Sequence, residues 1–162
     1  LSRQADFQDV FIVFRPHPAN HGFVDRIDQS NCVVYPKTGA LPSEDKSREE
    51  MFLCLKSAIC VVGVNTSGML DAVINDTNTI AICHKAYTAT QNQTIHFKEL
   101  LDSGCMDYVN DVTDIPQKIR DVNKLKDPFL VARRKFIEAF VRPIGLSKCA
   151  GEEIVESLEN LI

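Results

Sequence analysis

The chain has 162 residues, of which 44% are hydrophobic and 25% are charged, a composition typical of one folded domain and not of a disordered segment. Its 18 basic and 22 acidic residues give a formal net charge of -4, without the basic excess that neutralises nucleic-acid phosphates, so we expect no nucleic-acid partner. No apolar run approaches the ~20 residues that cross a bilayer, so we expect no transmembrane segment.

The cysteines and histidines favour reduced thiols and no metal site. The six cysteines form no C-x-x-C pair and lie in apolar stretches, which indicates buried, reduced thiols and a cytoplasmic location. The four histidines have no cysteine at zinc-finger spacing, and Pro18 prevents a continuous helix from presenting His17 and His21 as a metal-binding pair. Because the chain begins with Leu1 and not with methionine, we expect it to be part of a longer protein.

The first predicted elements are strands on either side of an unusual loop. Residues 10–14 are a continuous β-branched and aromatic run, typical of a strand that is buried on both faces. The loop FRPHPAN follows, residues 20–27 are expected to form a short helix, and residues 32–35 read as a second strand.

The middle of the chain continues the alternation of helix and strand. Ser47 can cap a helix that ends near Ser57, and Glu50 completes a capping box. The later elements predicted are a buried strand at 59–64, a helix over 69–74 entered directly from 65–68, a strand at 79–83, a helix over 95–102, a strand at 107–109 and a helix from 111 or 113 towards 124.

The last part of the chain is predicted to be helical. Asp127 and Pro128 fit the N-cap and first position of a helix. In that helix the basic run Arg133-Arg134-Lys135 is more typical of a solvated face than of a binding site. A final amphipathic helix closes the chain.

The order of these elements predicts the fold class. Strands alternate with helices through short loops, which indicates βαβ units in a parallel sheet. We therefore expect an α/β, Rossmann-like, doubly wound sheet with helices on both faces. Residues 1–162 would form one domain, with the sheet and its helices in about 1–126 and C-terminal helices packing at the end in 127–162.

Two loops carry the residues that could bind a ligand. Ligands of open parallel sheets bind outside the carboxyl ends of the strands. The segment Arg15-Pro16-His17-Pro18 follows the first predicted strand, and Asn65-Thr66-Ser67-Gly68 follows the third. The sequence has no G-x-G-x-x-G and no Walker A motif, which excludes the dinucleotide and P-loop interpretations, and the lack of a G-x-S-x-G elbow argues against a hydrolase triad.

The second loop fits a phosphate. Thr66 and Ser67 lie where a helix begins, so unpaired N–H groups, the helix dipole and two hydroxyls could all meet an anion, with Asn65 beside them. Gly68 would keep the approach clear of side chains. The alternative is that Thr66 or Ser67 merely caps the helix.

His17, Arg15 and Asp71 complete the predicted site. His17, held between two prolines, could donate to a phosphate oxygen or act as a catalytic cation beside a leaving diphosphate; alternatively it is a packed turn residue. Arg15 could hold a phosphate or pair with Asp71. Asp71 could accept a ribose hydroxyl or face solvent.

These motifs resemble a known family. A strand ending in R-P-H-P, a strand running into N-T-S-G-x-x-x-D-A and a strand reading T-I-A-I are similar to the C-terminal, donor-nucleotide-binding lobe of GT-B fold transferases. The nearest resemblance is to CDP-glycerol glycerophosphotransferases and to capsule-polysaccharide and sialic-acid type transferases that use cytidine nucleotides. The resemblance implies that His17, Thr66 and Ser67 contact the donor phosphate and that Asp71 lies near the ribose.

The resemblance also implies what the chain needs from elsewhere. GT-B enzymes have a second, N-terminal lobe that commonly carries the acceptor-side base, so this chain would be the donor-binding half of a transferase of surface polysaccharide synthesis, inactive alone. Its substrate would be a CMP- or CDP-linked sugar or polyol, with no other cofactor. The full-length protein would act in the cytoplasm, at the inner face of the membrane. The alternatives are a nucleotide-sugar 2-epimerase lobe and a noncatalytic Rossmann-like binding module.

Overall fold

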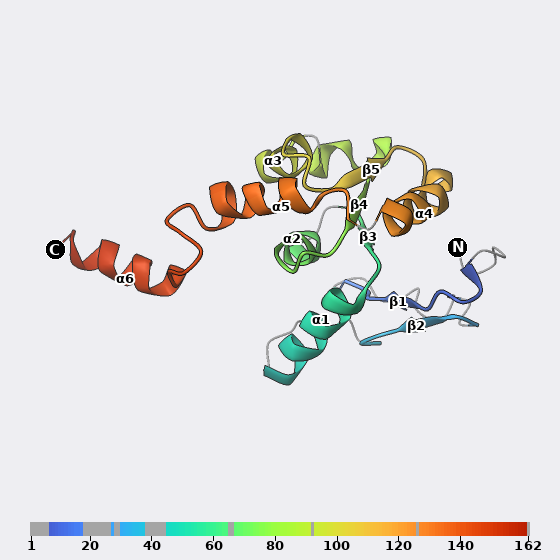
Figure 1. Ribbon diagram of the computed structural model, residues 1–162, viewed down its shortest axis with the longest axis horizontal. Coiled ribbons are helices and arrows are strands. Elements are labelled where there is room, and N and C mark those ends of the chain that lie inside the picture. The colour runs from blue at the N-terminus through green and yellow to red at the C-terminus, as the bar shows by residue number, and fades with distance from the viewer. Residues whose placement is uncertain are drawn as a thin grey trace. The chain divides into compact units, whose positions relative to one another are not determined.

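The computed structural model describes residues 7–17, 27, 30–37, 45–64, 67–91, 93–125 and 127–161 (Figure 1). The chain divides into two compact units, Leu1–Phe52 (the first unit) and Leu53–Ile162 (the second unit). In the described part of the chain, no helix is both long and apolar enough to cross a membrane. The assignment of residues 1–162 to one domain stays a prediction.

The first unit contains a pair of parallel strands. Strand β1 (Ile12–Phe14) pairs with β2 (Cys32–Val34), with Ile12 opposite Cys32. The Asn31 side-chain amide donates to the backbone carbonyls of Phe7 (2.8 Å) and Val10 (3.1 Å), which ties the approach to β1 to the start of β2. The short helix predicted over residues 20–27 lies outside the described residues, except for residue 27.

The prediction that the first strand is buried on both faces is wrong. The side chains of Phe11 and Val13 are 68% and 42% exposed. Among the described residues β1 pairs only with β2, and of these two strands only β2 has buried residues, Cys32 and Val34. A two-stranded sheet buries one face, so the β-branched run reflects strand propensity more than depth.

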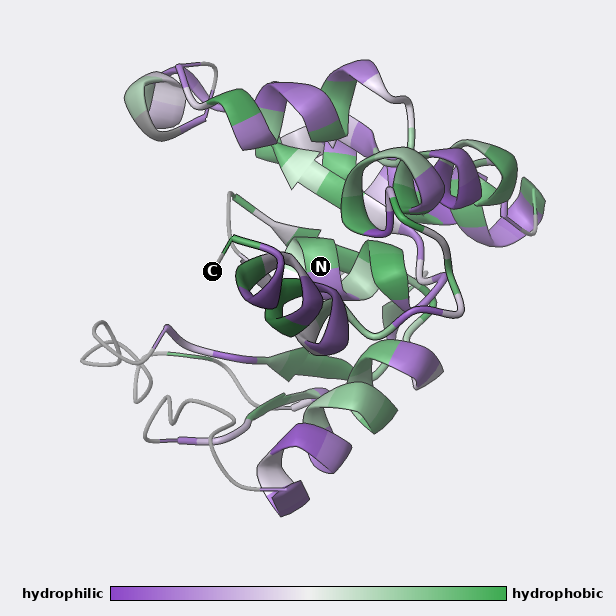
Figure 2. Cartoon of the chain, turned by 90° about the vertical axis from the view of Figure 1, so that its left-hand side faces the viewer, coloured by the Kyte–Doolittle hydropathy of each residue, from purple (hydrophilic) through white to green (hydrophobic). Residues whose placement is uncertain are grey.

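Helix α1 (Asp45–Ser57) ends at the residue that the sequence predicted. It begins two residues before Ser47, which therefore lies inside the helix and is not its cap. Asp45 supplies a negative charge to the first turn and Lys56 a positive charge to the last, and both charges favour the helix dipole. The first half of α1 is hydrophilic, and its hydrophobic residues follow in the second half (Figure 2).

The second unit is built on a three-stranded parallel sheet in the order β3-β4-β5. Its strands are β3 (Val61–Gly63), β4 (Thr79–Ile82) and β5 (Asp107–Val109). Its helices are α2 (Ser67–Ile74), the 3₁₀ helix η3 (Lys85–Thr90), α3 (Ile95–Asp102), the 3₁₀ turn η4 (Val112–Asp114), α4 (Ile115–Leu125), α5 (Leu130–Phe136), the π-helical turn η5 (Ile137–Val141) and α6 (Ala150–Glu159).

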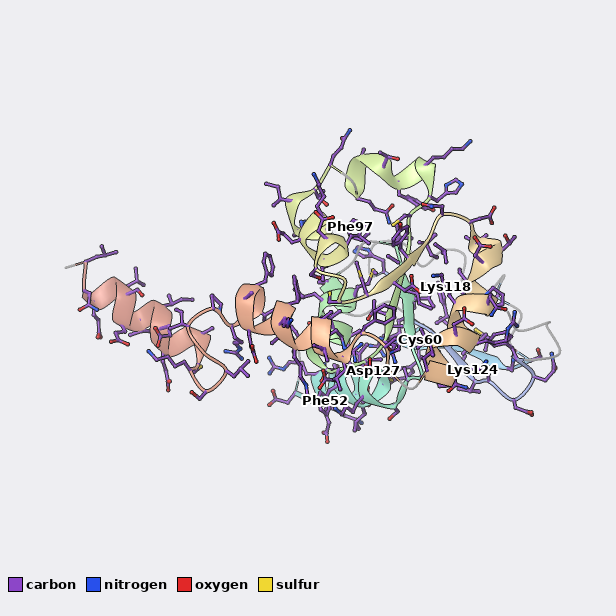
Figure 3. All side chains as sticks on the ribbon, turned by 45° about the horizontal axis from the view of Figure 1, so that its top comes forward. Phe52, Cys60, Phe97, Lys118, Lys124 and Asp127 are labelled. Carbon is purple, nitrogen blue, oxygen red and sulfur yellow. The ribbon has the colours of Figure 1, made fainter. Side chains whose placement is uncertain are left out.

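Helices cover both faces of this sheet (Figure 1). On one face α2, α3 and α5 pack around β4 through a core that includes Met69, Ala81, Phe97 and Phe136, and Figure 3 labels the fully buried Phe97 on α3. On the other face α4 turns inward the buried residues that recur at helical spacing, Ile115, Ile119 and Val122. Alternation along β4 places Ala81 in the first core and the fully buried Ile80 on the opposite face.

The predicted α/β class with parallel strands flanked by helices is confirmed. The two small sheets are compatible with a Rossmann-like arrangement. In the second unit the order β3-β4-β5 follows the chain, which is the simplest arrangement of two consecutive βαβ units. Strand β3 is half-buried throughout, not buried as predicted, because it forms an edge of its sheet.

The turn from α2 into β4 is a Schellman motif with an aspartate where glycine is usual. Thr77 N–H donates to Ala72 O (2.9 Å) and Asp76 N–H to Val73 O (3.1 Å), and Asp76 has a φ of 58°. The left-handed conformation is unfavourable for an L-residue, so the motif needs stabilisation from outside the turn.

Arg133 on α5 supplies that stabilisation. Its guanidinium is fully buried and donates to Asp76 O (3.0 Å), to Asn78 Oδ1 (3.3 Å) and to the carboxylate of Asp127. Asp127 also has a positive φ, 121°, and lies just before α5 (Figure 3). The buried Arg133 guanidinium therefore stabilises two aspartates with positive φ and connects α5 to the start of β4.

This geometry corrects two predictions about the C-terminal part. The basic run is not a uniformly solvated face, because Arg133 is buried while Arg134 and Lys135 are exposed. Asp127 does not cap the helix from the N-cap position, since α5 begins at Leu130 and Phe129 is its N-cap. The Asp127 carboxylate instead accepts from Phe129 N–H (3.3 Å) and binds Arg133.

Replacing Arg133 by methionine should lower the free energy of unfolding by about 3 kcal/mol, because two aspartates and a buried carbonyl lose their cation. The matched control is Arg134→Met on the neighbouring, 64% exposed side chain, which should cost no more than about 0.5 kcal/mol. Urea denaturation followed by circular dichroism measures both. Equal losses in the two variants would contradict the assigned role of Arg133.

Candidate functional site

Helix α2 begins at the carboxyl end of β3, where the sequence places the phosphate-binding loop. Ser67 is the first residue of α2 and is exposed, and Gly68 is half-buried. Asn65 and Thr66 lie outside the described residues. A Cβ added to Gly63 would lie 3.1 Å from Cγ and Sδ of Met69, so glycine at the end of β3 lets α2 return closely over the strand.

Asp71 lies one helical turn after Ser67, on the same face of α2. Its side chain is half-buried, and this burial raises the pKa of the carboxyl above its ordinary value. A carboxyl that is held partly out of water gains more from a hydroxyl donor than a fully solvated one does. Its position and environment are suitable for accepting a ligand hydroxyl.

Gln91 joins the carboxyl ends of β3 and β4. The side chain is 1% exposed, and its amide nitrogen donates to Val64 O (2.8 Å) and to Ile82 O (2.7 Å). At the neighbouring strand end, Cys83 N–H donates to Val109 O (2.7 Å). These bonds fix the three strand ends relative to one another and satisfy carbonyls that would otherwise lack donors.

A wide, open pocket of about 500 Å³ lies at the carboxyl ends of β4 and β5, and most of the residues that line it are exposed. We call it the β4–β5 pocket, and its lining residues are Cys83, His84, Lys85, Thr88, Asn110 and Asp111. His84 caps η3, with Nδ1 accepting from Ala86 N–H at 3.2 Å. In its neutral form His84 therefore carries the ring proton on Nε2.

Asp111 is the fixed negative charge of the β4–β5 pocket. Its Oδ1 accepts from Thr113 N–H (2.9 Å) and from the Thr113 hydroxyl (2.8 Å). These two bonds lower the pKa of Asp111 below its ordinary value, and the nearby His84 lowers it further by a smaller amount. Burial acts on Cys83 in the opposite sense and raises the pKa of its thiol, which favours the neutral form.

The loop after β1 carries the other part of the predicted site. The Arg15 guanidinium carbon lies 5.9 Å from the centre of the Tyr35 ring, a cation–π geometry within the first unit. Pro16 is buried and His17 is exposed, which anchors the backbone while leaving the imidazole accessible. Pro18 lies outside the described residues.

The structure brings together part of the predicted set. Ser67, Gly68 and Asp71 share the first two turns of α2. Arg15 and His17 share the end of β1, in the first unit. That the two loops serve one ligand stays a prediction, as does the pairing of Arg15 with Asp71.

Sequence reasoning missed three residues of this edge, His84, Gln91 and Asp111. A signal exists for two of them, because His84 directly follows a predicted strand and Asp111 comes two residues after the end of another. The sequence pattern indicates Asp111 only as the start of a helix, which it also is. The buried Gln91 carries no comparable signal, since a glutamine in a polar loop is ordinarily exposed.

Comparisons with known proteins do not test the resemblance to transferases, which stays a prediction. No family model, curated protein or solved structure matches the chain. Among the described residues, no group of three or more His, Cys, Asp or Glu side chains gathers that could hold a metal ion. All six cysteines are free, and Cys149 is exposed, contrary to the expectation that the cysteines are buried.

Replacing Thr113 by valine should raise the pKa of Asp111 towards its ordinary value, because one of its two Thr113 hydrogen bonds is lost. The native shift is a depression, so the stability it contributes is present above the unfolded-state pKa and is lost as pH falls through the lower folded-state pKa. Carboxyl ¹³C NMR titration measures the value directly.

The matched control is Thr113→Ser, which keeps the hydroxyl that donates to Asp111 and should leave the pKa of that carboxyl close to its wild-type value. An Asp111 pKa that is equal in Thr113→Val and wild type would contradict this account.

Proposed function

We propose that this chain is the donor-nucleotide-binding half of a glycosyltransferase or glycerophosphotransferase of surface polysaccharide synthesis. It would bind the phosphates of a cytidine-nucleotide donor at the carboxyl edge of the β3-β4-β5 sheet. The observation that supports the proposal best is the start of α2 at that edge, with an exposed Ser67 in its first turn and Asp71 one turn later. Ligands of parallel α/β sheets bind at such edges.

The physical basis of the proposal is charge neutralisation without a metal ion. The first N–H groups of a helix have no intrahelical acceptor, so a phosphate oxygen can accept them, and the helix dipole favours its charge. The Ser67 hydroxyl adds a further donor. As the bond to the transferred group breaks, negative charge grows on the departing phosphate, and preorganised donors stabilise it more than they stabilise the ground state.

By the resemblance of its loop, His17 would serve as a hydrogen-bond donor or a cation for the donor phosphate. Its exposure leaves the ring accessible. The buried Pro16, whose ring fixes its own φ, limits the backbone freedom of the chain just before His17. A second lobe would supply the acceptor and its base. An accessible histidine next to a rigid backbone also fits the noncatalytic alternative, in which His17 binds no phosphate.

Titration calorimetry should detect binding of CDP, with CMP weaker, because the second phosphate adds charge for the helix terminus to neutralise. Ser67→Ala should weaken CDP binding about tenfold, the effect of one hydrogen bond to a charged group. The matched control is Ser57→Ala at the exposed end of α1. If the wild type binds none of CMP, CDP and UDP at millimolar concentration, the proposal fails.

His17→Ala should weaken CDP binding by a similar factor if the two loops contact one phosphate. His96→Ala, at an exposed position on α3, is the matched control. The loss of CDP affinity in His17→Ala is to be compared with the losses in Ser67→Ala and in the double variant. Undiminished CDP affinity in His17→Ala would remove the first loop from the phosphate site, leaving the α2 terminus to act without it.

A further inference from the structure

The β4–β5 pocket offers both hydrogen-bond donors and acceptors. The Nε2–H of neutral His84 is a donor, and so are the Lys85 ammonium and the Asn110 amide. The Thr88 hydroxyl gives its proton to Lys85 O (2.9 Å), which leaves its oxygen as an acceptor. Asp111 binds both Thr113 groups through Oδ1, so Oδ2 is available to accept from a ligand.

This mixture selects a chemical class of ligand. A phosphate presents only acceptor oxygens at its ionised positions, and the carboxylate of Asp111 would repel it. A hydroxyl donates one hydrogen bond and accepts others, so neighbouring hydroxyls can satisfy Asp111 and His84 at once. Because the positive charge of Lys85 balances the negative charge of Asp111 in the lining, a neutral, hydroxyl-bearing group fits the pocket better than an anion does.

The pocket also lies at a suitable distance from the start of α2. Adjacent strands of a sheet are about 4.8 Å apart. Helix α2 begins after β3, and the pocket lies at the ends of β4 and β5, one or two strand positions further along the edge. Strand spacing therefore gives a separation of about 5–10 Å along this edge, which is short enough for one donor molecule to reach both places.

We propose that the β4–β5 pocket binds the hydroxyl groups of the sugar or polyol that a nucleotide donor carries, with Asp111 and His84 as the residues that recognise them. The proposal rests on the proposed function, whose phosphate site lies at the start of α2. It assigns recognition of the transferred group to residues that are distinct from the phosphate-binding loop.

The test compares CDP with CDP-glycerol by titration calorimetry on the full chain. The wild type should bind CDP-glycerol about tenfold more tightly than CDP, and Asp111→Asn and His84→Ala should each bring this ratio close to one while changing CDP affinity little. Asparagine still caps η4 through Thr113 N–H, so folding should survive the loss of charge. Asp114→Asn, in the same turn but outside the pocket lining, is the matched control.

A second measurement separates this proposal from the proposed function. Free glycerol and glucose, titrated at high millimolar concentration in ¹H–¹⁵N NMR spectra, should shift the amides of His84, Lys85 and Asp111 in the wild type but not in Asp111→Asn. Absence of nucleotide binding together with these shifts would overturn the proposed function and support the pocket assignment. CDP binding with no preference for CDP-glycerol and no glycerol or glucose shifts would overturn the pocket assignment alone.

Discussion

The candidate site depends on the Gln91 amide, which holds the ends of two parallel strands together. A glutamine amide nitrogen has two protons, and here both are used on main-chain oxygens, those of Val64 and Ile82. Both bonds are protected from water, since Gln91 is 1% exposed. The start of α2 follows one of these strand ends and the β4–β5 pocket follows the other, so this side chain extends the backbone pairing of β3 with β4 to the edge where the two proposed subsites lie.

The opposite end of β4 is held by a charge and not by an amide. Arg133 binds the turn that precedes β4 and stabilises two aspartates with positive φ, Asp76 and Asp127. The buried cation therefore lies at the amino end of the strand, away from the edge at which the ligand is proposed to bind.

Much of the second unit could be predicted from sequence, for identifiable reasons. The helix at 95–102 and the strand at 107–109 are predicted with the bounds that α3 and β5 have, because apolar spacing changes sharply between them. The burial of a strand is predicted less well. A β-branched run such as residues 10–14 indicates a strand, but it does not indicate whether one face or both faces of that strand are buried. The burial of Arg133 depends on Asp76, which is far from it in sequence, and on Asp127, which adopts an unusual φ. Neither feature can be recognised in a local sequence pattern.

The candidate site was predictable to a similar extent. Ser67 and Asp71 could be placed because a helix that begins directly after a strand offers its first N–H groups to an anion. His84 and Asp111 have local structural roles as caps of η3 and η4, and those roles conceal their common position at one sheet edge. Only the pairing of β4 with β5 brings the two residues into one pocket.

The central claim, that nucleotide phosphates bind at the carboxyl edge of the β3-β4-β5 sheet, is tested most directly by a crystal structure of the chain grown with CDP. The account predicts diphosphate oxygens within hydrogen-bond distance of the first-turn N–H groups of α2 and of the Ser67 hydroxyl. A diphosphate bound anywhere else on the chain, with the first turn of α2 uncontacted, would contradict it.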